Sequence, residues 1–184
     1  MRIGILALQG AVSEHAICLK KLNLNVTLVK EPKDLTNLNG LIMPGGESTT
    51  LRKLLKNSNI WEKLKQSNIP IMGTCAGAIL IGKSKETNLG KIDMETNRNY
   101  YGRQKDSFEK SINLENKNKF KGIFIRAPAI TIIGPNVEPI AWDEEKIVGC
   151  REQKHMALTF HPELTEDLRF HRWLLTSALK TKGL

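Results

Sequence analysis

A chain of 184 residues is long enough to bury one sizeable core and short for two, so we expect a single domain spanning residues 1–184. It contains no apolar run of about 20 residues, and its first ten residues lack the features of a signal peptide, so we expect a cytoplasmic protein with no membrane association. The formal net charge of +9 would suit nucleic acid, but the lysines are scattered and aromatic residues are few, so no nucleic-acid binding is predicted.

Strand and helix signals alternate through the first half of the chain. Short apolar runs predict buried strands at residues 2–8, 24–29, 40–43 and 69–72. Between them, apolar residues at helical spacing predict a helix carrying Val12, Ala16, Leu19 and Leu22, a helix carrying Leu51, Leu54 and Leu55 that Ser48 or Thr49 can cap, and a helix over residues 78–82. This alternation is typical of parallel strands with helices on both faces of the sheet.

The second half of the chain indicates mostly strands. Residues 83–121 are polar and are expected to form loops and short edge strands. Strand-like runs then follow at residues 123–126, 129–133, 139–142, 146–150 and 156–160, and a final helix is predicted at 166–179. We therefore predict an α/β three-layer sandwich, with a mostly parallel central sheet and an antiparallel extension.

Cys75 lies in unusual surroundings for a cysteine. Cys18 and Cys150 fall on an amphipathic helix and an apolar run, where a buried structural cysteine is the usual explanation. Cys75, by contrast, is the centre of Gly73-Thr74-Cys75-Ala76-Gly77, between a strand and a helix, where a strained turn can expose a nucleophile. The helix N-terminus would favour a thiolate, and the Ala76 N–H could face an oxyanion. The alternative is that these small residues only allow close packing.

His161 is the candidate base for this cysteine. His15 and His171 are predicted to lie on solvated helix surfaces, and His155 begins an apolar run. Pro162 restricts His161 to an extended conformation, and extended residues two apart face the same way, so Glu163 can accept the ring N–H of His161. Alone, this segment could be an ordinary turn, but with Cys75 it completes a nucleophile, base and carboxylate.

A glycine-rich turn ends the third predicted strand near the same edge of the sheet. In Pro44-Gly45-Gly46-Glu47-Ser48, the glycines can bring backbone N–H groups close to a ligand. The spacing and lysine of a P-loop are absent, so a phosphate site is the weaker interpretation, and a plain tight turn is the alternative.

Several blocks of sequence, spread nearly from end to end, match one known family. They cover residues 8–12 with 14–15, 44–50, 73–77, 101–104 with 106–108, 124–128 and 160–167. On these blocks the chain resembles the glutaminase subunits of pyridoxal 5'-phosphate synthase, which are class I glutamine amidotransferases of flavodoxin-like fold. The cysteine turn and the His161–Glu163 pair mark the wider class, and the other blocks are specific to the vitamin B6 branch.

The resemblance implies a function and a set of site residues. Cys75, His161 and Glu163 would form the triad that hydrolyses L-glutamine to L-glutamate and ammonia, with the N–H groups of Ala76 and Gly46 as the oxyanion hole. Glutamine binding would fall to Gly46, Glu47, Ser48, Arg98, Ile125 and Arg126. No metal or cofactor is expected. The ammonia would pass to a synthase subunit, which in this family forms a dodecameric core decorated by glutaminase subunits.

Two other functions share these motifs. A glutaminase of another pathway, such as histidine biosynthesis, would have the same triad but different partner-facing blocks. A cysteine-bearing stress protein, chaperone, peptidase relative or degenerate binding module would typically lack a glutamate two residues after the histidine. The blocks at 101–108 and 124–128 argue against the first, and Glu163 argues against the second.

Overall fold

The computed structural model describes residues 1–83, 88–98 and 107–181. The predicted blocks at 101–104 and at Asp106 therefore lie outside the described residues. Within the described part of the chain, no helix is long and apolar enough to cross a membrane. The helices and strands follow in the order β1 (Arg2–Leu6), α1 (Val12–Lys21), β2 (Asn25–Val29), η1 (Pro32–Leu35), β3 (Gly40–Met43), α2 (Ser48–Asn57), α3 (Ile60–Gln66), β4 (Ile71–Thr74), α4 (Ala76–Ile81), β5 (Met94–Asn97), β6 (Phe108–Leu114), β7 (Lys119–Phe124), β8 (Ala129–Ile133), β9 (Glu138–Asp143), β10 (Lys146–Glu152), β11 (His155–Leu158), η2 (Pro162–Leu164) and α5 (Arg169–Thr181).

A nine-stranded sheet forms the centre of the molecule, in the order β2-β1-β3-β4-β11-β10-β9-β6-β7. The strands from β2 to β11 pair in parallel, and those from β11 to β7 pair antiparallel. The predicted α/β fold, a mostly parallel sheet with an antiparallel extension, is thus confirmed. One predicted strand of that extension is placed elsewhere, because β8 pairs with β5 in a separate two-stranded sheet.

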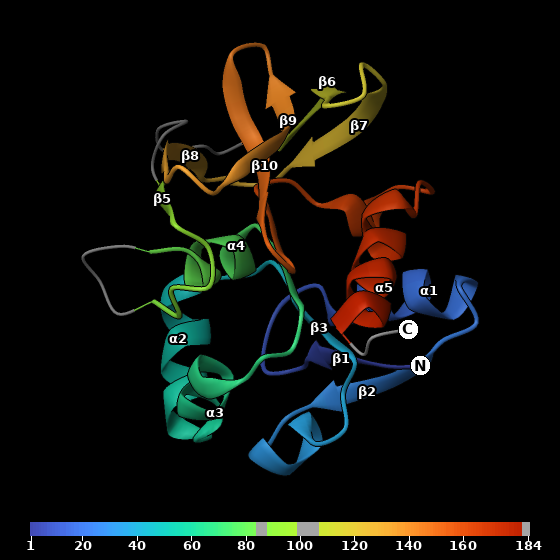
Figure 1. Cartoon of the computed structure of the whole chain (residues 1–184), viewed down its shortest axis with the longest axis vertical. Helices are drawn as coiled ribbons and strands as arrows, with labels where there is room; N and C mark the ends of the chain where they lie inside the picture. The colour runs from blue at the N-terminus through green and yellow to red at the C-terminus, as the bar shows by residue number, and fades with distance from the viewer. Residues whose placement is uncertain (84–87, 99–106, 182–184) are drawn as a thin grey trace.

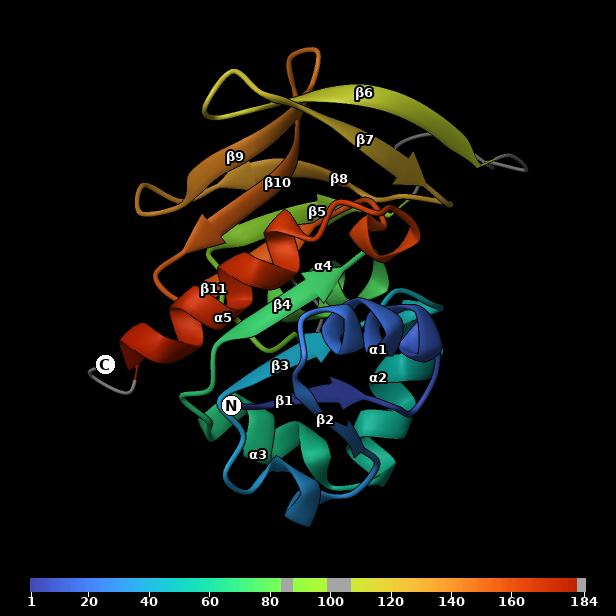
Figure 2. The same cartoon turned by 90° about the vertical axis from the view of Figure 1, so that its right-hand side faces the viewer.

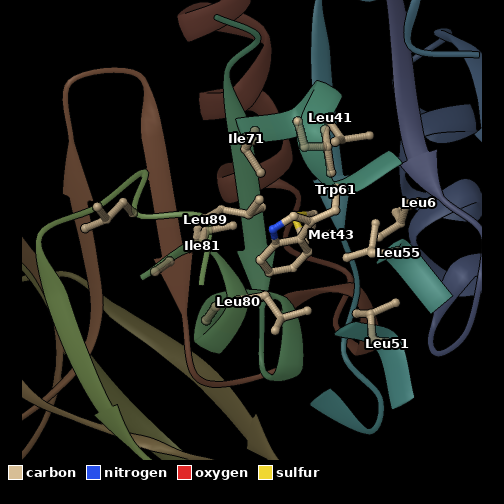
Figure 3. Close-up of a cluster of buried hydrophobic side chains, with 14 of the residues drawn as sticks. Leu6, Leu41, Met43, Leu51, Leu55, Trp61, Ile71, Leu80, Ile81 and Leu89 are labelled. Carbon is tan, nitrogen blue, oxygen red and sulfur yellow. The ribbon is translucent and has the colours of Figure 1, made fainter. Parts of the chain in front are cut away.

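Helices cover both faces of the parallel strands. Figure 2 shows α1 and α5 in front of these strands, while α2 and α3 lie on the far side; Figure 1 shows the same two groups on opposite sides. Alternate residues of a strand face opposite sides, and in β3 Leu41 and Met43 join one buried cluster while Ile42 joins the other. Trp61 of α3 lies among leucine side chains of the first cluster (Figure 3). Burial on both faces explains why these strands read as continuous apolar runs.

Several predicted element boundaries are wrong: the strand predicted at 69–72 is β4, Ile71–Thr74, and the strand predicted at 123–126 is the end of β7, Lys119–Phe124. At two helices the structure shows the reason. The cap of α2 is Glu47 rather than Ser48 or Thr49, and its carboxylate accepts the N–H groups of Thr49 and Thr50. The last helix begins at Arg169 and not at Glu166: after the 3-10 turn Pro162–Leu164, Asp167 Oδ1 accepts the Arg169 N–H at 3.0 Å. In both places a side-chain or turn interaction, which periodicity does not detect, decides where the helix begins.

The polar middle of the chain contains more sheet than predicted. β6 is seven residues long and lies between β9 and β7, so it is an internal strand and not an edge strand. Its Ile112 and Leu114 are buried, Phe108 and Lys110 are half-buried, and the residues between these four are exposed. Lys110 hides this alternation in the sequence, because a charged residue occupies a position on the inward-facing side. The antiparallel half of the sheet is consequently wider than the apolar runs indicate.

Candidate active site

The carboxyl ends of the parallel strands open into one cavity of about 880 Å³. Such ends are where open α/β sheets bind ligands. The cavity receives the turn after β1, the glycine turn after β3, Cys75 after β4 and His161 after β11. All the predicted glutamine-binding and oxyanion residues line it, namely Gly46, Glu47, Ser48, Ala76, Arg98, Ile125 and Arg126. Glu163 is the one predicted site residue that does not, because it lies behind His161.

Cys75 sits in a strained turn between β4 and α4. Its backbone has φ 47° and ψ −105°, a conformation that costs a non-glycine residue on the order of 1–3 kcal/mol. The neighbouring glycines permit this turn: a Cβ on Gly77 would lie 1.9 Å from the Met43 carbonyl oxygen. The Cys75 N–H donates to Leu158 O at 2.8 Å, which fixes the turn to β11. The sequence-predicted turn is therefore present.

The thiol of Cys75 lies at the start of α4 and is only 6% exposed. Its Sγ is 3.7 Å from the carbonyl oxygen of Ile125. The first turn of a helix has N–H groups without intrahelical acceptors, and these favour an anion close by. The cysteine thus combines a strained backbone with a thiol that lines the cavity at the start of a helix.

His161 joins Cys75 to Glu163. Its Nδ1 lies 2.7 Å from Glu163 Oε1, and its buried Nε2 has no hydrogen-bond partner among the described residues. Burial lowers the pKa of His161, but the interactions with Cys75 and Glu163 outweigh burial and raise the pKa to about 10. Gly45 permits the close approach, since a Cβ there would lie 2.5 Å from His161 Cε1 and 3.2 Å from Cys75 Cβ. The site therefore favours an imidazolium next to the cysteine.

The polar wall of the cavity supplies groups of both charges. Glu47 Oε1 and Oε2 accept the N–H groups of Thr49 and Thr50. The side-chain hydrogen bond from Thr50, together with these N–H groups, lowers the pKa of Glu47 to about 2, so it is a carboxylate at neutral pH. Arg98 Nη1 donates to Thr49 Oγ1 at 3.2 Å, and Arg126 lies in the left-handed region with φ 46°. Free amino acids carry an ammonium and a carboxylate, so a cavity with one glutamate and two arginines suits such a ligand.

The turn after β1 is part of the cavity wall, which sequence reasoning missed. Gln9 Oε1 accepts the Glu47 N–H at 3.1 Å, and the Gly45 carbonyl accepts the Ala11 N–H at 3.2 Å. Because the peptide is planar and trans, the N–H of Gly46 points away from Ala11. Two signals in the sequence pointed to this turn: it follows a buried strand, and residues 8–12 are one of the blocks that match the family.

The prediction of solvated positions for His15 and His171 is wrong. Both side chains are fully buried between α1 and α5, with His15 Nδ1 3.0 Å from His171 Nε2. The predicted burial of Cys18 and Cys150 is confirmed. Helical spacing did place His15 on α1, but the sequence does not show that its face of the helix meets α5 and Glu163.

Among the described residues, no three side chains of His, Cys, Asp or Glu gather as a metal site.

A family model, described as the SNO glutamine amidotransferase family, matches residues 5–180. The chain belongs to the SNO glutamine amidotransferase family. It is accordingly a glutaminase of the amidotransferase class, which excludes the stress-protein and chaperone alternatives.

Relatives and solved structures agree with this family. The chain is 46% identical to "Pyridoxal 5'-phosphate synthase subunit PdxT" of Methanocaldococcus jannaschii, over 98% of this chain and 100% of that protein. It is 44% identical to the protein of the same name from Clostridium botulinum, over 99% and 100%. A crystal structure of a glutamine amidotransferase superposes with a TM-score of 0.90 at 39% identity, covering 96% of this chain and 98% of the other. Another glutamine amidotransferase, from Thermotoga maritima, shares the fold at 15% identity and a TM-score of 0.63, covering 100% of this chain and 92% of the other.

Proposed function

We propose that this chain hydrolyses L-glutamine through Cys75, His161 and Glu163 and delivers the ammonia to the synthase subunit of pyridoxal 5'-phosphate synthase. The observation that carries the proposal is the strained Cys75 turn, facing the same cavity as a His161 that Glu163 holds at 2.7 Å. The names of the near full-length relatives support the pathway.

The reaction begins with attack of the Cys75 thiolate on the side-chain amide carbon of glutamine. The N–H groups of Ala76 and Gly46 stabilise the oxyanion that forms. Imidazolium His161 then donates its proton to the amide nitrogen, the carbon–nitrogen bond breaks, and ammonia leaves. Neutral His161 next takes a proton from water, the hydroxide attacks the thioester, and the thiolate departs from the glutamate product. Glu163 accepts the Nδ1–H of His161 throughout.

Glutamine lies in the cavity with its two charged groups against charged side chains. The carboxylate of Glu47 holds the ammonium, and Arg98 or Arg126 holds the carboxylate, while Ser48 and Ile125 contact the remainder. The carboxylate of Glu47 caps helix α2 at the same time, so its position is fixed before the substrate arrives. The predicted binding residues thus have chemistry complementary to the charged groups of glutamine.

The partner is a synthase subunit. Ammonia released into water is diluted and protonated, and the protonated form is not a nucleophile, so a docked acceptor protects it. We propose that glutaminase subunits decorate a dodecameric synthase core, and that the complex is cytoplasmic, where a reducing environment would preserve the free cysteines Cys18, Cys75 and Cys150.

The test measures ammonia release from glutamine by the wild type and by Cys75→Ala, each alone and with the cognate synthase subunit. We expect Cys75→Ala to abolish turnover. Cys150→Ala is the matched control, since it removes a buried cysteine from another part of the sheet and should retain activity. Turnover by Cys75→Ala would exclude the mechanism. Turnover that is indifferent to the synthase would instead favour a glutaminase of another pathway.

A further inference from the structure

A second group of buried polar side chains begins at the far oxygen of Glu163. Glu163 Oε2 lies 3.4 Å from His15 Nε2, and the same Nε2 lies 3.2 Å from Thr74 Oγ1. On the other side of the ring, His15 Nδ1 lies 3.0 Å from Nε2 of His171. His15, His171 and Thr74 are all 0% exposed. We call His15 and His171 the buried histidine pair.

The acceptors around the pair determine where its protons lie. Because an ionised carboxylate can only accept hydrogen bonds, His15 satisfies Glu163 only with a hydrogen on Nε2. A neutral His15 then offers Nδ1 as an acceptor, and His171 must donate from its own Nε2. Nδ1 of His171 remains as a lone pair, and within the buried histidine pair it is the ring atom that has no hydrogen-bond partner among the described residues. A buried unpaired N–H is the rarer arrangement.

Burial keeps the pair neutral. It lowers the pKa of His15 by more than the nearby Glu163 raises it, and it lowers the pKa of His171 to about 3. For Glu163, burial raises the pKa, but His15 and His161 outweigh burial and lower it. The remaining titratable groups that act on these residues are Glu14, on His15, and Cys18, whose Sγ lies 3.7 Å from the main-chain oxygen of Glu163 and whose pKa burial raises.

Glu163 is therefore a buried carboxylate between one cation, His161, and one neutral donor, His15. A glutamate carboxylate turns easily about its last torsion. Donation from His15 to Oε2 would restrict this rotation and leave Oε1 for His161. In this structure Glu163 Oε2, 3.4 Å from His15 Nε2, is a buried atom with no hydrogen-bond partner among the described residues, so His15 is the donor nearest to an unsatisfied acceptor. Catalytic hydrogen bonds often form or tighten only when substrate is bound.

We propose that His15 is a positioning residue, which holds the Glu163 carboxylate in place for His161, and that His171 selects the tautomer of His15 that can do so. This inference rests on the proposed function, because Glu163 needs a fixed orientation only if His161 transfers protons. Thr74 immediately precedes Cys75, so the same ring nitrogen also connects the strand of the nucleophile to the carboxylate.

A merely structural role would be to pack α1 against α5. Loss of packing lowers the free energy of unfolding, but it does not change the pH at which the folded enzyme works. Loss of a donor to Glu163 does, because a buried carboxylate with fewer hydrogen bonds has a higher pKa. The pH profile of the folded enzyme therefore separates the two roles.

The experiment compares two variants of His15. His15→Leu removes the hydrogen-bond donor. His15→Gln keeps a donor, because its amide nitrogen is the same number of bonds from Cβ as Nε2 of histidine. Ammonia release is measured across pH with the synthase subunit present and normalised to folded protein. We expect His15→Leu to lower kcat by about 10-fold or more, to leave KM for glutamine unchanged, and to move the acid limb to higher pH. His15→Gln should restore most of kcat and the position of the limb.

The control is His155→Leu, which removes another buried histidine, one whose Nδ1 accepts the Ile71 N–H at the opposite end of the strands. It should leave the acid limb in place. An unchanged kcat and acid limb in His15→Leu, or no rescue by His15→Gln, would overturn the proposal.

A second measurement does not depend on turnover. Long-range proton–nitrogen spectra of the wild-type chain at neutral pH should show both histidines of the pair protonated on Nε2 alone. A His15 that is protonated on Nδ1, or on both nitrogens, would overturn the proposal even if both His15 variants failed to fold. Wild type without glutaminase activity on its synthase would instead refute the proposed function and leave the tautomer result standing.

Discussion

Glu163→Gln tests how the carboxylate tunes His161. The substitution keeps the shape of the side chain and removes its charge. A hydrogen bond to a charged group contributes about 1.5–3 kcal/mol and one between neutral groups about 0.5–1.5 kcal/mol. The imidazolium of His161, now 2.7 Å from a carboxylate oxygen, would therefore lose about 1–2 kcal/mol. This corresponds to a fall of about one unit in the pKa of His161 from its present value of about 10.

The assay is the pH dependence of kcat/KM for glutamine with the synthase subunit present. We expect kcat/KM to fall about 5- to 30-fold and the basic limb to move about one pH unit lower. The carboxamide of the Glu163→Gln variant cannot accept hydrogen bonds from both histidines, because an oxygen turned towards His161 leaves the NH₂ group facing Nε2 of His15. The measured loss in kcat/KM should therefore not be smaller than this range of about 5- to 30-fold.

Stability should follow the same protonation. The folded pKa of His161, about 10, is above its ordinary value of 6.5, so its stabilising contribution is complete below pH 6.5 and is lost as pH rises through 10. Denaturant unfolding should show Glu163→Gln less stable than wild type at pH 6, and the difference should disappear near pH 10. Glu166→Gln, on a 90% exposed side chain, is the matched control. An unmoved basic limb, or a pH-independent difference in stability, would refute this account of His161.

Two further predictions concern backbone and cap. Gly77→Ala would place a Cβ 1.9 Å from the Met43 carbonyl oxygen and should lower the free energy of unfolding by about 1–3 kcal/mol. In the control Gly90→Ala, the new Cβ meets nothing within 4 Å, so the only cost is that of a φ of +62°. Urea unfolding that finds Gly90→Ala less stable than Gly77→Ala would contradict the packing argument. Glu47→Ala removes the cap of α2 and should cost about 1 kcal/mol at pH 7. Because the pKa of Glu47 is depressed, this loss should shrink as pH falls below 4.5 towards about 2, and unfolding measured across that range checks it.

Much of the fold could be predicted because its signals are local. Strands buried on both faces read as short apolar runs, and β3 and β8 were predicted with the bounds that the structure has. The strained turn at Cys75 was predictable because its glycines are next to it, and the Glu163 contact with His161 because two extended residues share a face. Where polar residues mask the alternation, as in β6, the prediction failed.

The sequence by itself determined the chemistry of the front of the site: a cysteine on a glycine-flanked turn, and a histidine two residues from its carboxylate. Only the tertiary structure decided what lies behind them. His15 and His171 are 156 positions apart, and each looks like an ordinary polar residue on a helix until α1 and α5 pack on the same face of the sheet. Hydrophobic periodicity is a property of neighbouring residues, whereas the partner of a buried polar atom depends on which helices the sheet brings together. Glu163 shows both cases: its contact with His161 follows from residues two apart in the chain, whereas its contact with His15 depends on how α1 packs in the folded protein.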